Sequence, residues 1–82
     1  MDIEKIEAAI DRVITRYGKE PNCMTLCPSH FKEMGSPNYI KGIEVNEAIK
    51  REGLSNPLIE NEYSIIGVYD EELGYYDYEE II

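Results

Sequence analysis

The stretch DIEKIEAAIDRVITRYG, residues 2–18, decides the architecture because it carries the most regular apolar pattern in the chain. Its apolar side chains recur every three or four residues, which is typical of a helix with one buried stripe. Asp2 is a favourable N-cap, and Gly18 can end the helix in a left-handed conformation. The apolar positions are Ile3, Ile6, Ile10, Val13, Ile14 and Tyr17. We therefore predict a long N-terminal helix that packs one face on the rest of the molecule.

Short elements separated by chain breaks follow this helix. Residues 21–22 interrupt the chain, and residues 23–27 form an apolar run that predicts a buried strand, ended by the next proline. Ser29 is expected to cap one or two helical turns that continue to Met34. The Gly-Ser-Pro-Asn sequence of residues 35–38 then predicts a loop.

The second half of the chain predicts mainly strands. Residues 39–45 predict a strand, because Ile43 and Val45 alternate with Glu44, and residues 46–53 have the cap and terminator of a short helix. Residues 63–69 are rich in Ile, Val and Tyr, which favours a central strand. Residues 70–74 predict a turn, and residues 75–82 the second arm of a hairpin. We expect an α+β fold, in which the long helix packs on three or four largely antiparallel strands.

The net charge of −9 is concentrated at the C-terminal end of the chain. Residues 1–59 hold nine Asp or Glu and eight Lys or Arg, whereas residues 60–82 hold eight acids and no base. Phosphate binding needs Lys and Arg clusters, so this distribution disfavours nucleic acids and anionic membranes as direct partners. At 82 residues we expect a single domain, residues 1–82, with a small core.

Apolar runs and cysteine usage predict a cytoplasmic protein. The apolar runs are far shorter than the roughly 20 residues of a membrane span, and no apolar block follows a basic start. A secreted domain of this size usually carries four or more cysteines, and this chain has two, Cys23 and Cys27. On a strand their Cα atoms would lie about 13 Å apart, too far for a disulfide.

Cys23, Cys27 and His30 are the residues best suited to metal or nucleophile chemistry, yet their pattern is incomplete for both. Zinc needs four ligands, and the chain has no third cysteine and no second histidine. His30 could activate the Cys27 thiolate, but no orienting motif surrounds the pair. We therefore predict structural cysteines, no metal, no cofactor and no enzymatic activity. A small thiol-dependent enzyme using Cys27 is kept as an alternative.

The acidic residues of the C-terminal segment show no pattern of a cation site or an acid–base pair. A calcium loop needs acids at alternating positions with glycine at the sixth, and residues 70–74 do not supply this arrangement. Nothing places two carboxylates in contrasting environments of one cleft. The acids can serve as a solvated face that keeps the protein soluble, or as part of a binding surface.

Five of the seven tyrosines lie in the same acid-only segment, residues 60–82. Tyrosine offers a large, stiff contact area with a polar tip, and the centres of interfaces favour it. On the predicted C-terminal edge strand, alternate residues from Tyr76 to Glu80 share one face, and those alternating from Tyr75 share the other. The predicted partner-binding residues are Glu62, Tyr69, Asp70, Glu71, Glu72, Tyr75, Tyr76, Asp77, Tyr78, Glu79 and Glu80.

Carboxylates spaced along such a strand could imitate a phosphate backbone. A protein with a basic nucleic-acid groove would be attracted to them and blocked. We therefore predict a non-enzymatic module that binds a basic protein surface, such as an inhibitor of a nucleic-acid enzyme. The alternative is a structural, self-assembling subunit in which edge strands of several copies pair.

The order of the predicted elements resembles the peripheral domain of tailed-phage major capsid proteins. The likeness covers most of the chain and consists of a helix ending at Gly18, Pro-Asn at residues 21–22, PSHF at 28–31, IKGIEV at 40–45 and YSIIGV at 63–68. The resemblance implies a small phage or prophage protein that shares this helix-on-sheet unit. It transfers no functional residue to this chain.

Overall fold

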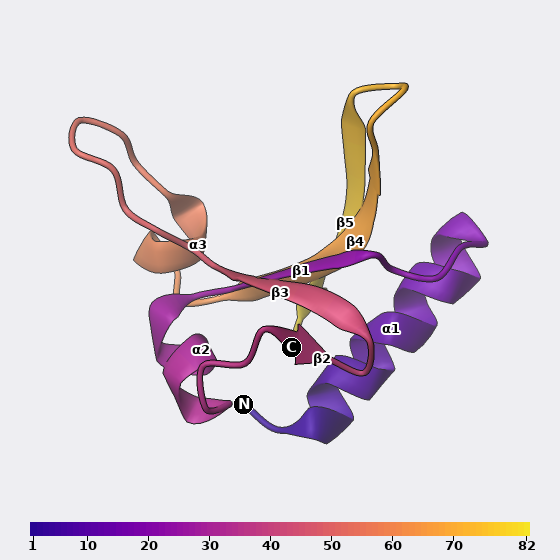
Figure 1. The fold of residues 1–82 in the computed structure, drawn as a ribbon, viewed down its shortest axis with the longest axis horizontal. Coiled ribbons are helices and arrows are strands. Elements are labelled where there is room, and N and C mark those ends of the chain that lie inside the picture. The colour runs from indigo at the N-terminus through magenta and orange to yellow at the C-terminus, as the bar shows by residue number, and fades with distance from the viewer.

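The computed structural model describes residues 1–82, with the side chain of Tyr75 left out of the description. One long helix lies against a five-stranded sheet with the strand order β2-β3-β1-β4-β5 (Figure 1). The helices are α1 (Ile3–Tyr17), α2 (Pro28–Glu33) and α3 (Pro57–Glu60). The strands are β1 (Cys23–Leu26), β2 (Tyr39–Ile40), β3 (Ile43–Glu47), β4 (Ser64–Asp70) and β5 (Tyr75–Ile81).

Helix α1 confirms the N-terminal helix predicted from the sequence. The Asp2 side chain accepts a hydrogen bond from the Lys5 amide at 3.1 Å, as an N-cap does. Gly18 adopts the left-handed conformation at φ +69°, and its amide donates to the Ile14 carbonyl at 2.9 Å. The fully buried positions of this helix are Ile6, Ala9 and Val13. No helix among the described residues is long and apolar enough to cross a lipid bilayer.

The α+β fold is confirmed, but the predicted number of three or four strands is wrong: the sheet has five strands, and one of its four pairings, β1 with β3, is parallel. The predicted strand at residues 39–45 is two antiparallel strands, β2 and β3. Lys41 and Gly42 separate them in left-handed conformations, at φ +52° and +77°, which forces a tight turn. Strand β3 pairs parallel to β1, because the chain crosses over through α2 before it returns, so the sheet is mixed.

The helix predicted at residues 46–53 is also wrong. Residues 46–47 complete β3, and the Ala48 amide donates to the Leu26 carbonyl at 2.8 Å, so pairing with β1 outweighs the local helix signal. Residues 48–56, which we call the arm loop, contain no helix. Helix α3 follows, capped by the Asn56 side chain. Helix α2 begins at Pro28 after Cys27, so the predicted capping role of Ser29 is wrong as well.

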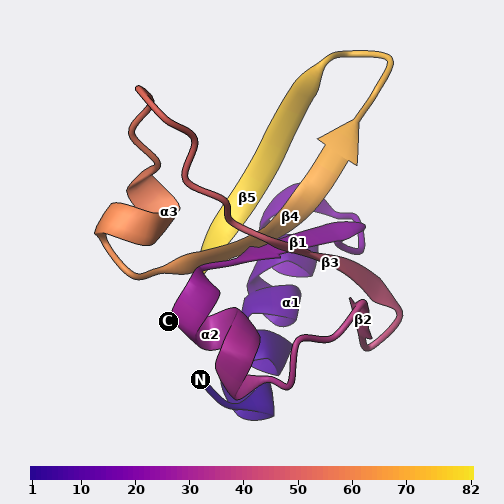
Figure 2. The same ribbon diagram turned by 60° about the vertical axis from the view of Figure 1, so that its left-hand side comes forward.

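The predicted hairpin of the last two strands is confirmed. Strands β4 and β5 pair antiparallel along their whole length around the turn at residues 71–74. The hairpin and the arm loop extend from the body of the molecule and diverge from each other (Figures 1 and 2). Strand β4 lies between β1 and β5, an interior position as the sequence predicts, and β1 is the middle strand of the five.

The core lies between α1 and one face of the sheet. It includes Met24 from β1, Val45 from β3 and Ile66 from β4. Because side chains alternate along strands, the residues between these positions share the opposite side, which we call the open face. The open face comprises Cys23, Thr25, Tyr39, Glu44, Asn46, Ile65, Gly67, Tyr69, Tyr76, Tyr78 and Glu80.

Candidate protein-binding surface

Three tyrosine rings pack together on the open face of the β4–β5 hairpin. Tyr69 and Tyr76 are cross-strand partners, and their ring centroids lie 6.3 Å apart at an interplanar angle of 46°. Tyr76 and Tyr78 follow each other on the same side of β5, with centroids 5.8 Å apart and planes at 28°. Tyr69 and Tyr78 remain 47% and 48% exposed. We call Tyr69, Tyr76 and Tyr78 the tyrosine platform.

Tyr76 anchors this platform to the centre of the sheet. The Cys23 thiol on β1 donates a hydrogen bond to the Tyr76 hydroxyl, with Sγ and Oη 3.0 Å apart. The Tyr76 side chain must therefore cross β4, which lies between β1 and β5. Burial raises the pKa of Tyr76 far above its ordinary value, and burial also raises the pKa of the Cys23 thiol. Both groups are therefore neutral at physiological pH.

Gly67 allows β5 to lie close to β4 beneath the platform. A Cβ atom at this position would overlap the Asp77 carbonyl oxygen and lie 2.8 Å from the Tyr78 Cα atom. Both atoms belong to the backbone of β5, so they cannot turn aside as a flexible side chain would. A glycine inside a strand often marks such a close backbone approach. Gly67 is therefore needed for the β4–β5 pairing that brings the tyrosines together.

Asn22 extends the pairing of β1 with β4 by one position. Its side-chain amide donates to the Tyr69 carbonyl at 3.0 Å, and its side-chain oxygen accepts from the Tyr69 amide at 2.9 Å. The backbone amide of Asn22 donates to the Gly67 carbonyl at 3.0 Å. Asn22 thus fixes the backbone that carries the first platform ring, whereas from the sequence it had indicated only a chain break.

The C-terminal carboxylates divide between the two faces of the sheet. Glu80 lies on the open face, two residues beyond Tyr78, and is exposed. Asp77 and Glu79 lie on the other face, and Glu79 forms an ion pair with Arg16 of α1 at 3.0 Å. Their hydrogen bond raises the pKa of Arg16. Of these three acids, the structure brings only Glu80 to the tyrosine platform.

The remaining residues of the predicted surface lie at the turns or outside the description. Asp70 caps the hairpin turn, because its carboxylate accepts from the amides of Glu72 at 3.0 Å and Leu73 at 3.1 Å. Glu71 and Glu72 are exposed in this turn. Glu62 is exposed in the loop before β4, toward the opposite end of that strand. The backbone of Tyr75 belongs to β5, but its side chain lies outside the described residues.

The open face also contains residues that sequence reasoning missed. Glu44 on β3 lies beside Cys23 in the sheet register, and its charge contributes to the raised pKa of the Cys23 thiol. Tyr39 on β2 pairs with Glu44 and is 67% exposed. The five strands contain six carboxylates and no Lys or Arg. Of these six, only Glu44 and Glu80 lie on the open face, which has exposed tyrosines and carboxylates on β2 and β3 as well as on the C-terminal hairpin.

The outer edge of β5 is partly covered by side chains of α1. The Tyr17 hydroxyl donates to the Tyr78 carbonyl at 3.2 Å, and the Arg12 guanidinium donates to the Glu80 carbonyl at 2.7 Å. These two acceptors are therefore occupied, as in folds that protect their edges from pairing. The opposite edge is β2, which is only two residues long. Both features disfavour edge-to-edge pairing, while the self-assembly prediction itself stays untested.

The structure places Cys27 and His30, which the sequence offers for thiol chemistry, at the start of α2. Cys27 is 1% exposed, and its Sγ lies 3.3 Å from the Ser29 hydroxyl. His30 Nδ1 lies 2.7 Å from the hydroxyl of Ser64, which is fully buried and accepts from the Cys27 amide at 2.9 Å. These bonds join the start of α2 to β4. Among the described residues, no group of three or more His, Cys, Asp or Glu could hold a metal ion.

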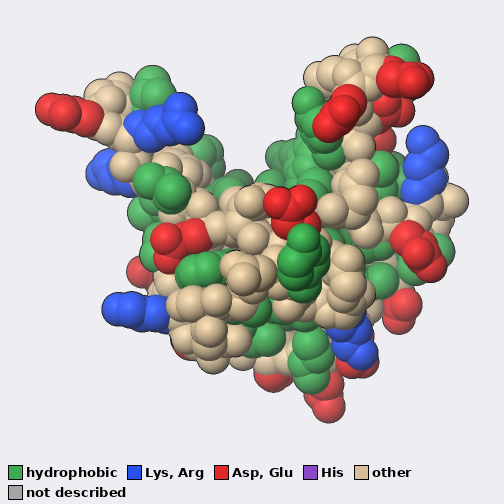
Figure 3. All heavy atoms as spheres, in the orientation of Figure 1, with side chains coloured by type: hydrophobic (Ala, Val, Ile, Leu, Met, Phe, Trp, Pro, Cys, Tyr) green, Lys and Arg blue, Asp and Glu red, His purple; other side chains and the backbone are tan. Residues whose placement is uncertain are grey.

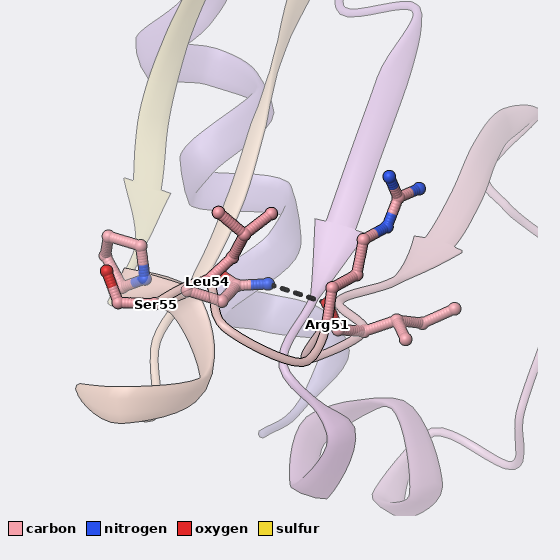
Figure 4. Close-up of a pocket in the computed structure, with 6 residues that line it drawn as sticks. Arg51, Leu54 and Ser55 are labelled. Carbon is pink, nitrogen blue, oxygen red and sulfur yellow. Dashed lines mark hydrogen bonds between the residues drawn. The ribbon is translucent and has the colours of Figure 1, made fainter.

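The arm loop carries a small, separate cavity of about 210 Å³. Figure 4 shows Leu54 and Ser55 at this cavity, with Arg51 earlier in the same loop. Ile49 and Leu54 are 68% and 61% exposed. Between the arm loop and the hairpin the surface is hollowed, and apolar side chains line the hairpin side (Figure 3). The cavity belongs to the loop, whereas the tyrosine platform belongs to the hairpin.

Comparison of the chain with protein-family models, with characterised proteins and with solved structures gave no match. What the protein does must therefore be inferred from its own surface. The open face is the most distinctive part of that surface, because it combines ordered aromatic rings with unbalanced negative charge.

Proposed function

We propose that the protein is a non-enzymatic binding module whose open face docks on a basic surface of a partner protein. The observation that supports this most directly is the tyrosine platform, which is held in place by Cys23 and yet leaves Tyr69 and Tyr78 half exposed. Rigid tyrosines lose little conformational entropy on binding and suit the centre of an interface. Docking would bury the surface of Tyr69 and Tyr78 that the fold leaves exposed.

The charge of the sheet suggests which partners the platform meets. Carboxylates without neighbouring cations on the strands attract basic surfaces and raise the rate of encounter. Grooves that bind nucleic acids are basic surfaces of this kind. We therefore infer an inhibitor that occupies such a groove, and the resemblance to phage proteins suggests a phage or mobile-element origin with a host protein as target.

The test compares two variants with the same change in net charge. Glu44→Lys with Glu80→Lys reverses charge on the open face. Asp11→Lys with Glu20→Lys reverses two exposed acids outside that face and serves as the control. Glu79 is left unchanged because its reversal would break the ion pair with Arg16. Each tagged protein is used to capture proteins from a bacterial lysate at low and at high salt, followed by mass spectrometry.

The wild-type protein and the control are expected to retain the same nucleic-acid-binding protein at low salt and to release it at high salt. Added duplex DNA should release it as well, because both ligands compete for one basic groove. The open-face variant should lose this protein. If the open-face variant captures it as well as the control does, the open face is not the binding surface and the proposal is wrong.

A further inference from the structure

The open face twice places an exposed tyrosine ring next to a carboxylate. Tyr78 and Glu80 are successive residues on the same side of β5, and both are exposed. Tyr39 and Glu44 are direct partners across β2 and β3, and both are exposed as well. A guanidinium group can stack on an aromatic ring and hydrogen-bond a carboxylate at the same time, whereas a lysine ammonium is a compact charge without a stacking plane.

The molecule already contains this arrangement on its other side. The Arg16 guanidinium lies over the Tyr17 ring, with 5.6 Å between Cζ and the ring centroid. The same guanidinium donates to Glu79, with Nη1 and Oε1 3.0 Å apart. One arginine thus satisfies a tyrosine and a glutamate together within this fold. On the open face the tyrosines and glutamates are present, and the strands contribute no arginine to them.

We propose that the open face binds arginine side chains of an extended basic segment of the partner. One guanidinium stacks on Tyr78 and pairs with Glu80, and a second occupies Tyr39 and Glu44. The two sites lie at opposite ends of the row formed by Tyr39, Glu44, Cys23, Gly67 and Tyr78. Four strand spacings span about 19 Å, which an extended segment of about six residues covers.

The space above the sheet suits such a segment. The surface is hollowed between the hairpin and the arm loop (Figure 3), so a chain that enters beside the hairpin has room above the sheet. Gly67 and Cys23 in the middle of the row are small residues, and the half-buried Tyr76 side chain reaches across β4 to Cys23. The exposed rings of the row, Tyr39 and Tyr78, stand at its two ends, where the arginines are expected.

This inference rests on the proposed function and adds the chemistry of the ligand. Its test therefore compares a ligand that carries arginines with one that carries the same charge on lysines. The probes are two peptides of nine arginines or nine lysines, titrated into ¹⁵N-labelled protein at 0.15 M salt. Each stacked guanidinium at an exposed site is expected to contribute a two- to fivefold gain in affinity. With two sites, the arginine peptide should bind roughly tenfold tighter, with chemical-shift changes centred on β2, β3 and β5.

Variants at Tyr78 and Glu80 assign the effect to the proposed site. Tyr78→Leu should reduce the preference for arginine to about threefold while changing the lysine affinity little. Tyr78→Phe retains the ring and should keep the full preference. Glu80→Gln should weaken both peptides, and Asp11→Asn, which removes an exposed acid of α1, should weaken them less. The ¹⁵N spectra show in the same titrations whether each variant is folded.

Equal affinity for the two peptides, unchanged by Tyr78→Leu, would overturn the arginine inference. If Glu80→Gln still weakened both peptides in that case, the proposed docking on basic surfaces would remain. If neither peptide bound, the arginine inference would fall, and capture from the lysate would then decide the proposed function independently.

Discussion

The two faces of the sheet differ in what covers them, although the same strands build both. On one face α1 packs over Met24, Val45 and Ile66, and the core lies there. On the other face Tyr69 and Tyr78 stay half exposed. Since neighbouring residues of a strand point to opposite sides, a single position along the chain separates a residue of the core from one available for binding. The comparison teaches that residues of the core and residues of the open face can be altered separately.

The sharpest test of this difference uses two neighbouring isoleucines of β4. Ile66 is fully buried beneath α1, whereas Ile65 is partly exposed on the open face. Ile66→Ala is expected to lower the free energy of unfolding by about 3–4 kcal/mol, because it leaves a cavity in the core. Ile65→Ala should cost about 1 kcal/mol, since less apolar area is lost. Urea unfolding measures both, and equal losses would contradict the division into two faces.

A smaller loss of stability is expected from a substitution at Gly67, which lies on the open face and packs against the backbone of β5. Gly67→Ala should lower the free energy of unfolding by about 3 kcal/mol, because the new methyl group overlaps the backbone of β5. Gly35→Ala is the control, since this glycine has a positive φ and open space, and should cost about 1 kcal/mol. Hydrogen exchange of β5 amides should accelerate in Gly67→Ala alone. Unchanged protection of β5 would show that the strand accommodates the methyl group.

The smallest change in stability at neutral pH is expected from removing the hydrogen bond between Cys23 and Tyr76. Burial raises the pKa of both groups, so above the ordinary cysteine value of 9.0 the folded protein retains protons that the unfolded chain has lost. Stability should therefore fall as the pH rises above about 9. Cys23→Ala combined with Tyr76→Phe removes both groups and should flatten this dependence. Urea unfolding from pH 7 to 10.5 under reducing conditions measures it, and parallel curves would contradict the buried contact.

Local signals in the sequence predict the elements that depend on neighbouring residues. The apolar spacing of residues 3–17 and the caps at Asp2 and Gly18 predict α1, and the structure confirms it. The turn at residues 70–74 predicts the hairpin in the same way. The helix prediction for residues 46–53 fails because Glu47 pairs with Leu26 of β1, a partner distant in sequence. Local propensity cannot anticipate that competition.

The residues of the candidate surface likewise fall into two groups, those that a local pattern predicts and those whose position depends on the pairing of distant strands. The two-residue period places Tyr76, Tyr78 and Glu80 on one side of β5, as predicted. Glu44 and Tyr39 could not be predicted, because their place on the open face depends on the parallel pairing of β3 with β1. The Gly67 position gave a usable sequence signal, since a glycine within a predicted strand indicates a close backbone approach.

The sequence by itself determined the long helix, the C-terminal hairpin and the separation of acids and tyrosines into the last quarter of the chain, since each depends on residues a few positions apart. The tertiary structure decided which face of the sheet α1 covers and which acids remain beside the tyrosines. It also joined Cys23 to Tyr76 and placed Tyr39 and Glu44 on the same surface. These features depend on strand order and register, which arise when distant segments compete to bury apolar area and to pair their backbones.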